Sequence, residues 1–313
     1  MNKIKAFLRL ARWSNLLFVA LTQWMFIYCI TEPIFGSAHL LPNIHGDLIP
    51  LLILSYVLVA AGGYIINDYF DLNIDQINKP DKVVIDKYIG RRWAIFFHLF
   101  FTLSSIVIGI YIDTKTHIYV VGLSNLLNGI FLFVYSLSLK KKLLVGNVMI
   151  AFLLAWVIVV ITSCEANQFS FLVRNKLINT QKLLRYTILY AGFAFIINLI
   201  REAVKDMEDV EGDRRYGCRT MPIAWGINAT KVFVAVWLVV LIAILSLLQF
   251  YAFQLQWWFF SLYCIVAIIA PLVRIFKKLS IAQTPKDYHS ISSLIKLVML
   301  TGILSMIFFK IYG

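Results

Sequence analysis

Residues 48–75 read LIPLLILSYVLVAAGGYIINDYFDLNID, an apolar stretch that runs directly into three aspartates. The part 48–67 carries no charged side chain and has the length that an α-helix needs to cross the hydrocarbon core of a bilayer. The whole chain shares this character, since 61% of its 313 residues are hydrophobic and only 14% are charged. Charged residues make up about a quarter of a soluble globular domain. The composition therefore excludes a soluble enzyme, a disordered tail and a fibrous repeat.

Scanning for apolar runs of similar length predicts nine membrane-spanning helices. They cover residues 14–33, 48–67, 93–112, 117–138, 143–163, 186–200, 230–251, 256–275 and 290–312. The sixth run is short, and it reaches spanning length only if its helix continues into the polar segment that follows. The predicted fold class is all-α, a polytopic integral membrane bundle. No Pro-, Gly- or Ser-rich linker divides the chain, so residues 1–313 are predicted to form a single domain.

The net charge of +13 is distributed unevenly along the chain. If the spans cross the membrane in alternating directions, 22 of the 29 Lys and Arg residues lie on the same side of the membrane as the N-terminus. Six lie on the opposite side, and Lys296 lies inside the last span. An excess of basic residues marks the cytoplasmic side of a membrane protein. We therefore predict a cytoplasmic N-terminus and an outer C-terminus, in the cell (inner) membrane. The charge needs no nucleic acid partner, although Arg174, Lys176, Lys182 and Arg185 in the outer loop 164–185 run against the pattern.

Two short windows, residues 67–75 and 205–213, follow the second and the sixth predicted spans. Together with Glu202 they hold nine of the 16 acidic residues of the chain. Both contain the spacing D-x2-D-x3-D, with Asp68, Asp71 and Asp75 in the first window and Asp206, Asp209 and Asp213 in the second. On a helix these positions lie within an arc of about 60°. Each window is therefore predicted to present three carboxylates on one helix face. Glu202 shares the face of Asp206, whereas Glu208 and Glu211 are expected to be solvated or capping acids.

Carboxylates gathered at low dielectric repel one another and require a cation between them. Hard oxygen ligands in this number suit Mg²⁺, which is usually held by a few carboxylates and shares its remaining positions with substrate phosphates. We predict that the six aspartates are catalytic residues and ligands of Mg²⁺. The alternative, two ordinary solvated loops, is disfavoured because cytoplasmic loops favour Lys and Arg over acids and the spacing occurs twice.

Basic side chains near the windows complete the electrostatics of a phosphate site. The candidates are Lys79, Arg91, Lys140 and Lys205. Arg can fork onto a diphosphate and Lys can act as a point charge. The alternative explanation for each of them is the general excess of basic residues on the cytoplasmic side of membrane proteins, which needs no role in binding. Asn15 is a further candidate because it is polar within the first span, where a helix–helix hydrogen bond is the alternative explanation.

The window at Asn67–Asp75, followed by Asn78-Lys79-Pro80, and the stretch Arg201–Asp213, followed by Thr220-Met221-Pro222, resemble the two aspartate motifs of the UbiA superfamily of membrane prenyltransferases. The nine-span layout resembles that family along the whole chain. The form R-E-x2-K-D-x-E-D-x-E-G-D is most similar to the archaeal-type ether-lipid branch, the digeranylgeranylglyceryl phosphate synthases. Its D-V-E-G-D portion is shared with chlorophyll synthases and homogentisate prenyltransferases.

The resemblance implies that the six aspartates hold Mg²⁺ on the diphosphate of an isoprenyl donor, and that Asn67, Lys140 and Lys205 contact phosphate or metal. Lys79 stands where many members have Arg, so a forked contact is absent there. The implied acceptor is the hydroxyl of geranylgeranylglyceryl phosphate, with an aromatic carbon such as that of 4-hydroxybenzoate as the alternative. The implied partners are thus an isoprenyl diphosphate donor, a lipid or aromatic acceptor, and membrane lipids.

Two alternatives come from other classes of protein. A secondary transporter also shows an internal sequence repeat and intramembrane carboxylates, but its binding site lies at the midplane of the bilayer on helices broken by Gly or Pro. Both windows here follow the ends of spans instead. The CDP-alcohol phosphotransferases also use clustered aspartates on membrane helices, but their D-G-x2-A-R opening is absent from the sequence.

Overall fold

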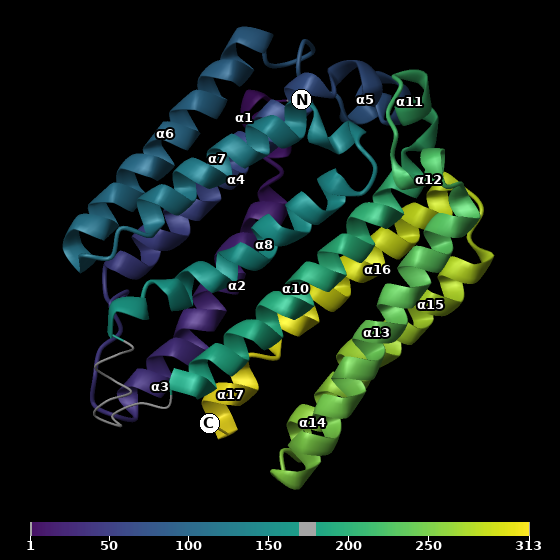
Figure 1. The fold of residues 1–313 in the computed structure, drawn as a ribbon. Coiled ribbons are helices and arrows are strands. Elements are labelled where there is room, and N and C mark those ends of the chain that lie inside the picture. The colour runs from purple at the N-terminus through teal and green to yellow at the C-terminus, as the bar shows by residue number, and fades with distance from the viewer. Residues whose placement is uncertain (1, 169–179, 313) are drawn as a thin grey trace. The chain divides into compact units, whose positions relative to one another are not determined.

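The computed structural model describes residues 2–168 and 180–312, and Arg174 and Lys176 lie outside these ranges (Figure 1). All the named elements in them are helical, and the only β-type contact is an isolated bridge between Ile85 and Ile89. The predicted all-α class is confirmed.

Apolar helices occupy all nine predicted positions in the described part of the chain. Eight of them are long and apolar enough to cross a membrane: Trp13–Gly36, Leu48–Phe70, Arg91–Thr116, Val145–Gln168, Thr180–Glu208, Ile227–Gln254, Trp258–Ile281 and Pro285–Tyr312. The ninth, α7 (Val121–Leu137), is apolar but shorter. The first segment consists of α2 (Trp13–Phe26), the π-turn η1 (Ile27–Thr31) and α3 (Glu32–Gly36). Four segments are α4 (Leu48–Phe70), α6 (Arg91–Thr116), α10 (Thr180–Glu208) and α13 (Ile227–Gln254).

The remaining bounds follow the same order along the chain. The segment after α7 begins with α8 (Val145–Ser163). The eighth segment comprises α14 (Trp258–Cys264), η4 (Ile265–Ile269) and α15 (Ala270–Ile281), and the last comprises α16 (Pro285–Leu304) and α17 (Ile307–Tyr312). The short elements are α1 (Lys3–Leu10), α5 (Leu72–Asn78), η2 (Pro80–Lys82), η3 (Leu139–Lys141), α11 (Val210–Arg215) and α12 (Met221–Ala224).

The sixth predicted span shows how the polar segment after it completes a helix. The apolar run 186–200 is too short to cross a bilayer, but α10 extends from Thr180 to Glu208 and so includes the start of the second window. The expected continuation of this helix into the polar segment is confirmed.

The chain packs as two compact units, which are described separately. Unit 1 comprises Met1–Lys140 and Trp156–Ile188, and unit 2 comprises Lys141–Ala155 and Leu189–Gly313. The first window belongs to unit 1 and the second window to unit 2. The single domain over residues 1–313 stays a prediction.

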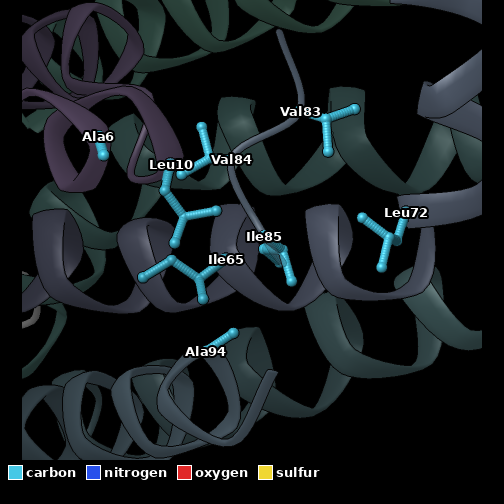
Figure 2. Packing of buried hydrophobic residues seen from close by; sticks show 8 residues of the cluster. All are labelled: Ala6, Leu10, Ile65, Leu72, Val83, Val84, Ile85 and Ala94. Carbon is cyan, nitrogen blue, oxygen red and sulfur yellow. The ribbon is translucent and has the colours of Figure 1, made fainter. Parts of the chain in front are cut away.

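An apolar cluster in unit 1 fixes the end of α4, where the first window begins. Its members come from α1, α4, α5, α6 and the loop after η2, and they are Ala6, Leu10, Ile65, Leu72, Val83, Val84, Ile85 and Ala94 (Figure 2). All are at most 8% exposed. Ile65 precedes the first window and Leu72 lies inside it, directly after Asp71, so their burial anchors the backbone that carries Asp68 and Asp71.

Two glycines bring α6 and α7 of unit 1 into backbone contact. A Cβ on Gly109 would lie 2.9 Å from the Cα of Gly122, closer than real Cβ contacts. The buried Asp113 accepts hydrogen bonds from the N–H groups of Val121 (2.9 Å) and Gly122 (2.8 Å), which start α7. This carboxylate satisfies N–H groups that have no partner within the helix.

Side-chain hydroxyls join the helices of unit 2. The hydroxyls of Tyr190 in α10 and Ser305, which follows α16, lie 2.9 Å apart. Tyr263 of α14 donates to the carbonyl oxygen of Thr301 in α16 at 2.8 Å. A Cβ on Gly302 would lie 2.5 Å from the ring of Phe193, so α10 and α16 approach closely at this glycine. The segment that carries the second window is thereby packed against α16.

Candidate active site

The first window contains a helix junction at its middle aspartate. Asp68 lies in the last turn of α4, Asp71 follows the end of that helix, and Asp75 lies in α5. Asp71 has φ −88° and ψ −1°, which lies in the bridge region of backbone conformations, next to the α region. Its N–H still bonds the Asn67 carbonyl at 2.9 Å, and its own carbonyl accepts from the Asp75 N–H at 2.8 Å. The uninterrupted helix face expected from the spacing is therefore interrupted, while its hydrogen bonds continue.

The second window repeats this arrangement in unit 2. Asp206 lies in the last turns of α10, Asp209 at the junction with φ −99° and ψ 8°, and Asp213 in α11. The N–H of Asp209 bonds the Lys205 carbonyl at 2.9 Å, and the N–H of Asp213 bonds the Asp209 carbonyl at 3.2 Å. The spacing that is repeated in the sequence is thus accompanied by a repeated backbone conformation. Such near-bridge conformations are common among active-site residues.

Two cations hold the carboxylates of the first window. Nη2 of Arg12 lies 2.6 Å from Oδ1 of Asp68, and Nζ of Lys140 lies 2.6 Å from Oδ1 of Asp71. Lys140 also donates to Oδ1 of Asn67 at 3.3 Å, and Nδ2 of Asn67 donates to Oδ2 of Asp71 at 2.9 Å. The structure therefore brings the predicted residues Asn67 and Lys140 together on Asp71. It adds Arg12, which no pattern in the sequence marked as a site residue.

The electrostatics of the first window favour one more positive charge. Burial, together with the neighbouring Asp71 and Asp68 carboxylates, raises the pKa of Asp75 to about 7, even though Arg12 and Lys79 act in the opposite direction. The Asp68 carboxylate raises the pKa of Arg12, so this guanidinium stays charged. The three carboxylates still repel one another with these cations nearby, and a divalent cation would relieve that repulsion.

Asn147 and Glu202 organise the second window. Nδ2 of Asn147, in α8, donates to Oδ2 of Asp206 at 2.8 Å. Glu202 is 7% exposed and accepts from Lys205 at 2.8 Å and from Arg201 at 3.1 Å. Lys205, predicted to contact phosphate or metal, is thus tied to a buried acid one turn before Asp206. The first aspartate of this window is held by an amide, whereas that of the first window is held by a guanidinium.

One expectation for the second window is wrong. Glu208 was expected to be solvated or capping, but its side chain is only 11% exposed and its Oε1 lies 3.0 Å from Nδ1 of His289 in α16. The contact arises because α16 packs beside α10, which the spacing within one helix does not reveal. Glu211 is 73% exposed and pairs with Arg215 at 2.7 Å, as a surface acid would.

The other predicted binding residues are placed differently from one another. Arg91 is 56% exposed and makes two contacts to Asp86, at 2.8 and 2.7 Å, so its guanidinium is engaged in the loop before α6. Lys79 lies directly after α5, four residues beyond Asp75. Asn15 is half-buried in the first turn of α2, where its N–H bonds the Arg12 carbonyl at 2.7 Å. The structure thus connects Lys79 to the first window through the backbone, connects Asn15 to Arg12, and leaves Arg91 apart.

Comparison with known proteins identifies the family. Residues 24–297 match the UbiA prenyltransferase family. The chain belongs to this family. It is 32% identical over 252 residues to the digeranylgeranylglyceryl phosphate synthase of Methanosphaera stadtmanae, which covers 80% of this chain and 83% of the relative. It is 31% identical to the enzyme of the same name from Sulfolobus acidocaldarius, over 80% of each chain.

Solved structures of UbiA proteins share the fold. A structure described for digeranylgeranylglyceryl phosphate synthase in membranes has a TM-score of 0.58 at 22% identity and covers 98% of this chain and 99% of the other. A UbiA homolog from Archaeoglobus fulgidus bound to GPP and Mg²⁺ has a TM-score of 0.56 at 14% identity, with 96% and 99% coverage. The UbiA chain is therefore an integral membrane prenyltransferase, and the transporter and phosphotransferase alternatives are set aside.

The donor set of this UbiA chain suits Mg²⁺, although the side chains are not arranged around an ion. In residues 2–168 and 180–312, no three His, Cys, Asp or Glu side chains converge into a ready metal site. Each window nevertheless supplies three hard oxygen donors within eight residues, which is the chemistry that Mg²⁺ prefers. In the first window, Oδ1 of Asp68 and Oδ1 of Asp71 contact Arg12 and Lys140. A metal ion at these oxygens would meet the charge repulsion of Arg12 and Lys140.

Two residues of this UbiA site were missed from the sequence. Arg12 stood among the basic residues that indicated a cytoplasmic N-terminus, and nothing in its surroundings marked it as the partner of an aspartate 56 residues away. Asn147 lies at the connection between the fourth and fifth predicted spans, where Tyr135-Ser136 to Lys140 and then Gly146-Asn147 also resemble the corresponding connection of the UbiA family. That resemblance was the one signal available for Asn147.

Proposed function

We propose that the protein transfers a geranylgeranyl group from its diphosphate to the hydroxyl of geranylgeranylglyceryl phosphate, with Mg²⁺ as the cofactor. The supporting relatives are digeranylgeranylglyceryl phosphate synthases that align over about four fifths of both chains. The observation that carries the proposal is the repeated junction at Asp71 and Asp209, which places three aspartates at the end of a membrane helix in each unit.

In this proposal the aspartates of both windows hold Mg²⁺ on the diphosphate of the donor. The six are Asp68, Asp71, Asp75, Asp206, Asp209 and Asp213. The metal supplies positive charge that stabilises the departing diphosphate. Lys140 and Asn67 orient Asp71, and Asn147 orients Asp206 through its 2.8 Å hydrogen bond. Lys79 and Lys205 add positive charge for the phosphate oxygens, each as a point charge.

The proposed reaction breaks the bond between the allylic carbon and the diphosphate oxygen. The electron pair leaves with the diphosphate while the allylic carbon gains carbocation character. The acceptor hydroxyl oxygen then bonds to that carbon and loses its proton to solvent, which gives an ether and diphosphate. The abundant aromatic side chains, 24 Phe and 15 Tyr among them, suit an isoprenoid chain and a cationic carbon.

We further propose that both windows face the cytoplasm, in the cell membrane. The excess of basic residues on the N-terminal side of the spans supports this orientation. A diphosphate donor is charged and water-soluble at its head, so it reaches a window on the cytoplasmic side without crossing the membrane.

The test is prenyl transfer by purified protein in detergent, with labelled geranylgeranyl diphosphate and Mg²⁺. Geranylgeranylglyceryl phosphate and 4-hydroxybenzoate are offered in parallel reactions. We expect a labelled diether phosphate and no labelled phenol. Label on 4-hydroxybenzoate alone would move the protein to the aromatic-acceptor branch, which the shared D-V-E-G-D portion of the second window makes the second candidate.

A further inference from the structure

Arg12 is held against the first window from two directions. Its Nη2 donates to Oδ1 of Asp68 at 2.6 Å, and its guanidinium carbon lies 5.2 Å from the centre of the Tyr64 ring. Tyr64 and Asp68 are one turn apart on α4, so both contacts are made to the same helix. The Arg12 side chain is 32% exposed and that of Asp68 20% exposed. The two side chains are therefore partly shielded from water at the C-terminal end of α4.

The backbone of Arg12 is specialised for this position. Arg12 separates α1 from α2 and has φ 52° and ψ 51°, the left-handed conformation that residues with a side chain rarely adopt. The N–H groups of Asn15 and Leu16 bond its carbonyl at 2.7 and 3.3 Å and begin α2. In α1, Ala6 and Leu10 pack into the apolar cluster at the end of α4 (Figure 2). Packing on one side and a helix start on the other thus hold Arg12 beside Asp68.

The contact has a consequence for metal binding. An arginine keeps its proton in proteins, so Arg12 stays a cation beside Asp68, and a metal ion bound to the same carboxylate meets its repulsion. Each cation on Asp68 therefore weakens the binding of the other. Arg12 matches the charge of the carboxylate with a single positive charge, whereas Mg²⁺ would bring two to a window whose carboxylates repel one another.

We propose that Arg12 is a built-in competitor of Mg²⁺ for Asp68, which offsets part of the negative charge of the metal-free window and sets the affinity of the site for the metal. This inference rests on the metal role proposed for Asp68. Metal loading releases Arg12 from Oδ1 of Asp68, and the carboxylate passes from a guanidinium to the ion. In the second window the first aspartate, Asp206, accepts a hydrogen bond from the amide of Asn147, which is neutral. We therefore assign this competition between cations to the first window.

The experiment measures Mg²⁺ binding rather than turnover. The purified proteins are unfolded thermally in detergent, first in EDTA and then across a Mg²⁺ titration with the metal alone. Wild type is compared with Arg12→Gln and Arg12→Lys, and with Arg91→Gln as the matched control. Arg91 has the same charge and pairs with Asp86 at 2.7 Å, away from the aspartates of the window.

Arg12→Gln is expected to unfold at a lower temperature than wild type in EDTA, because Asp68 loses its cation. Its dissociation constant for Mg²⁺ is expected to fall about fivefold, the factor that corresponds to a partly exposed ion pair. Arg12→Lys, with a single ammonium, is expected to lie between the two, and Arg91→Gln is expected to bind Mg²⁺ as wild type does.

Equal or weaker Mg²⁺ binding by Arg12→Gln would overturn the inference, as would a Mg²⁺ titration that shifts none of the proteins. If Arg12→Gln does not fold, Arg12→Lys decides in the same way, since tighter binding than wild type supports competition and equal or weaker binding contradicts it. Prenyl transfer by the wild type is measured separately. Absence of transfer would reject the proposed function, while the titration still decides whether Arg12 competes with the metal.

Discussion

Single residues differ between the two windows in how the first aspartate is held. Asp68 pairs with the charged Arg12, whereas Asp206 accepts a hydrogen bond from the neutral amide of Asn147. The spacing predicts both aspartates as site residues, because two copies of one pattern after two apolar runs are visible without a structure. It could not identify Arg12, because the pairing joins residues that are 56 positions apart and depends on how α1 packs.

Replacing either first aspartate should remove activity without unfolding the protein. We expect Asp68→Asn and Asp206→Asn each to lower kcat/KM about a thousandfold, since loss of a group that stabilises transition-state charge commonly has an effect of that size. The measurement is prenyl transfer by purified protein whose thermal unfolding resembles that of wild type. Asp81→Asn, which alters an exposed acid beyond the first window, is the control and should remain active. Normal activity in either first-aspartate variant would reject its metal role.

The hydrogen bond from Asn147 should have a smaller effect. Asn147→Ala leaves Asp206 without its 2.8 Å donor, and one hydrogen bond to a charged group contributes about 1.5–3 kcal/mol. We therefore expect kcat/KM to fall about tenfold or more, measured with saturating Mg²⁺. Asn228→Ala, in an exposed position of α13, is the matched control in unit 2. Unchanged kinetics for Asn147→Ala would show that Asp206 does not depend on this amide.

At the level of elements, each window lies where a long membrane helix ends and a short helix begins. Apolar run lengths predicted where α4 and α10 lie, and the polar continuation of α10 was expected because its apolar part is too short to span. The junctions at Asp71 and Asp209 could not be predicted. They involve a local change of φ and ψ at one residue, to which the periodicity of apolar residues over many turns is insensitive.

The glycine contact between α6 and α7 gives a prediction about stability. A Cβ at Gly109 would lie 2.9 Å from the Gly122 backbone, so Gly109→Ala must push the two helices apart. We expect a loss of about 1–3 kcal/mol in unfolding free energy, as for other overpacked sites. Gly192→Ala, in α10 where no atom lies within 4 Å of the new methyl group, should be neutral or stabilising by up to about 1 kcal/mol. Equal stability of the two variants in thermal unfolding would contradict the close contact.

For the whole molecule, the number of membrane crossings determines where the chain ends. Nine crossings put the two termini on opposite sides, whereas eight, if the shorter α7 did not cross, would put them on the same side. With the basic residues concentrated on the N-terminal side, we predict a cytoplasmic N-terminus and an outer C-terminus. A C-terminal fusion to alkaline phosphatase should therefore be active in cells, and a C-terminal green fluorescent protein dark. A bright fluorescent fusion would contradict nine crossings.

The family and the fold were predictable from the sequence because both windows have a specific spacing and a fixed place after particular spans. The cation pairs were not predictable, since they depend on the tertiary packing that brings Arg12 to Asp68 and Lys140 to Asp71. Under the proposed metal role, these pairs would give the first window two charge states, one with the protein's own cations and one with metal.

The most direct test of the central claim is the metal dependence of prenyl transfer to the lipid acceptor. Purified wild-type protein receives labelled geranylgeranyl diphosphate and geranylgeranylglyceryl phosphate, first with Mg²⁺, then with excess EDTA, then with Mg²⁺ restored. We predict labelled diether phosphate in the first and third conditions and none in the second. Undiminished transfer in EDTA, or no transfer in any condition, would contradict Mg²⁺-dependent prenyl transfer by this protein.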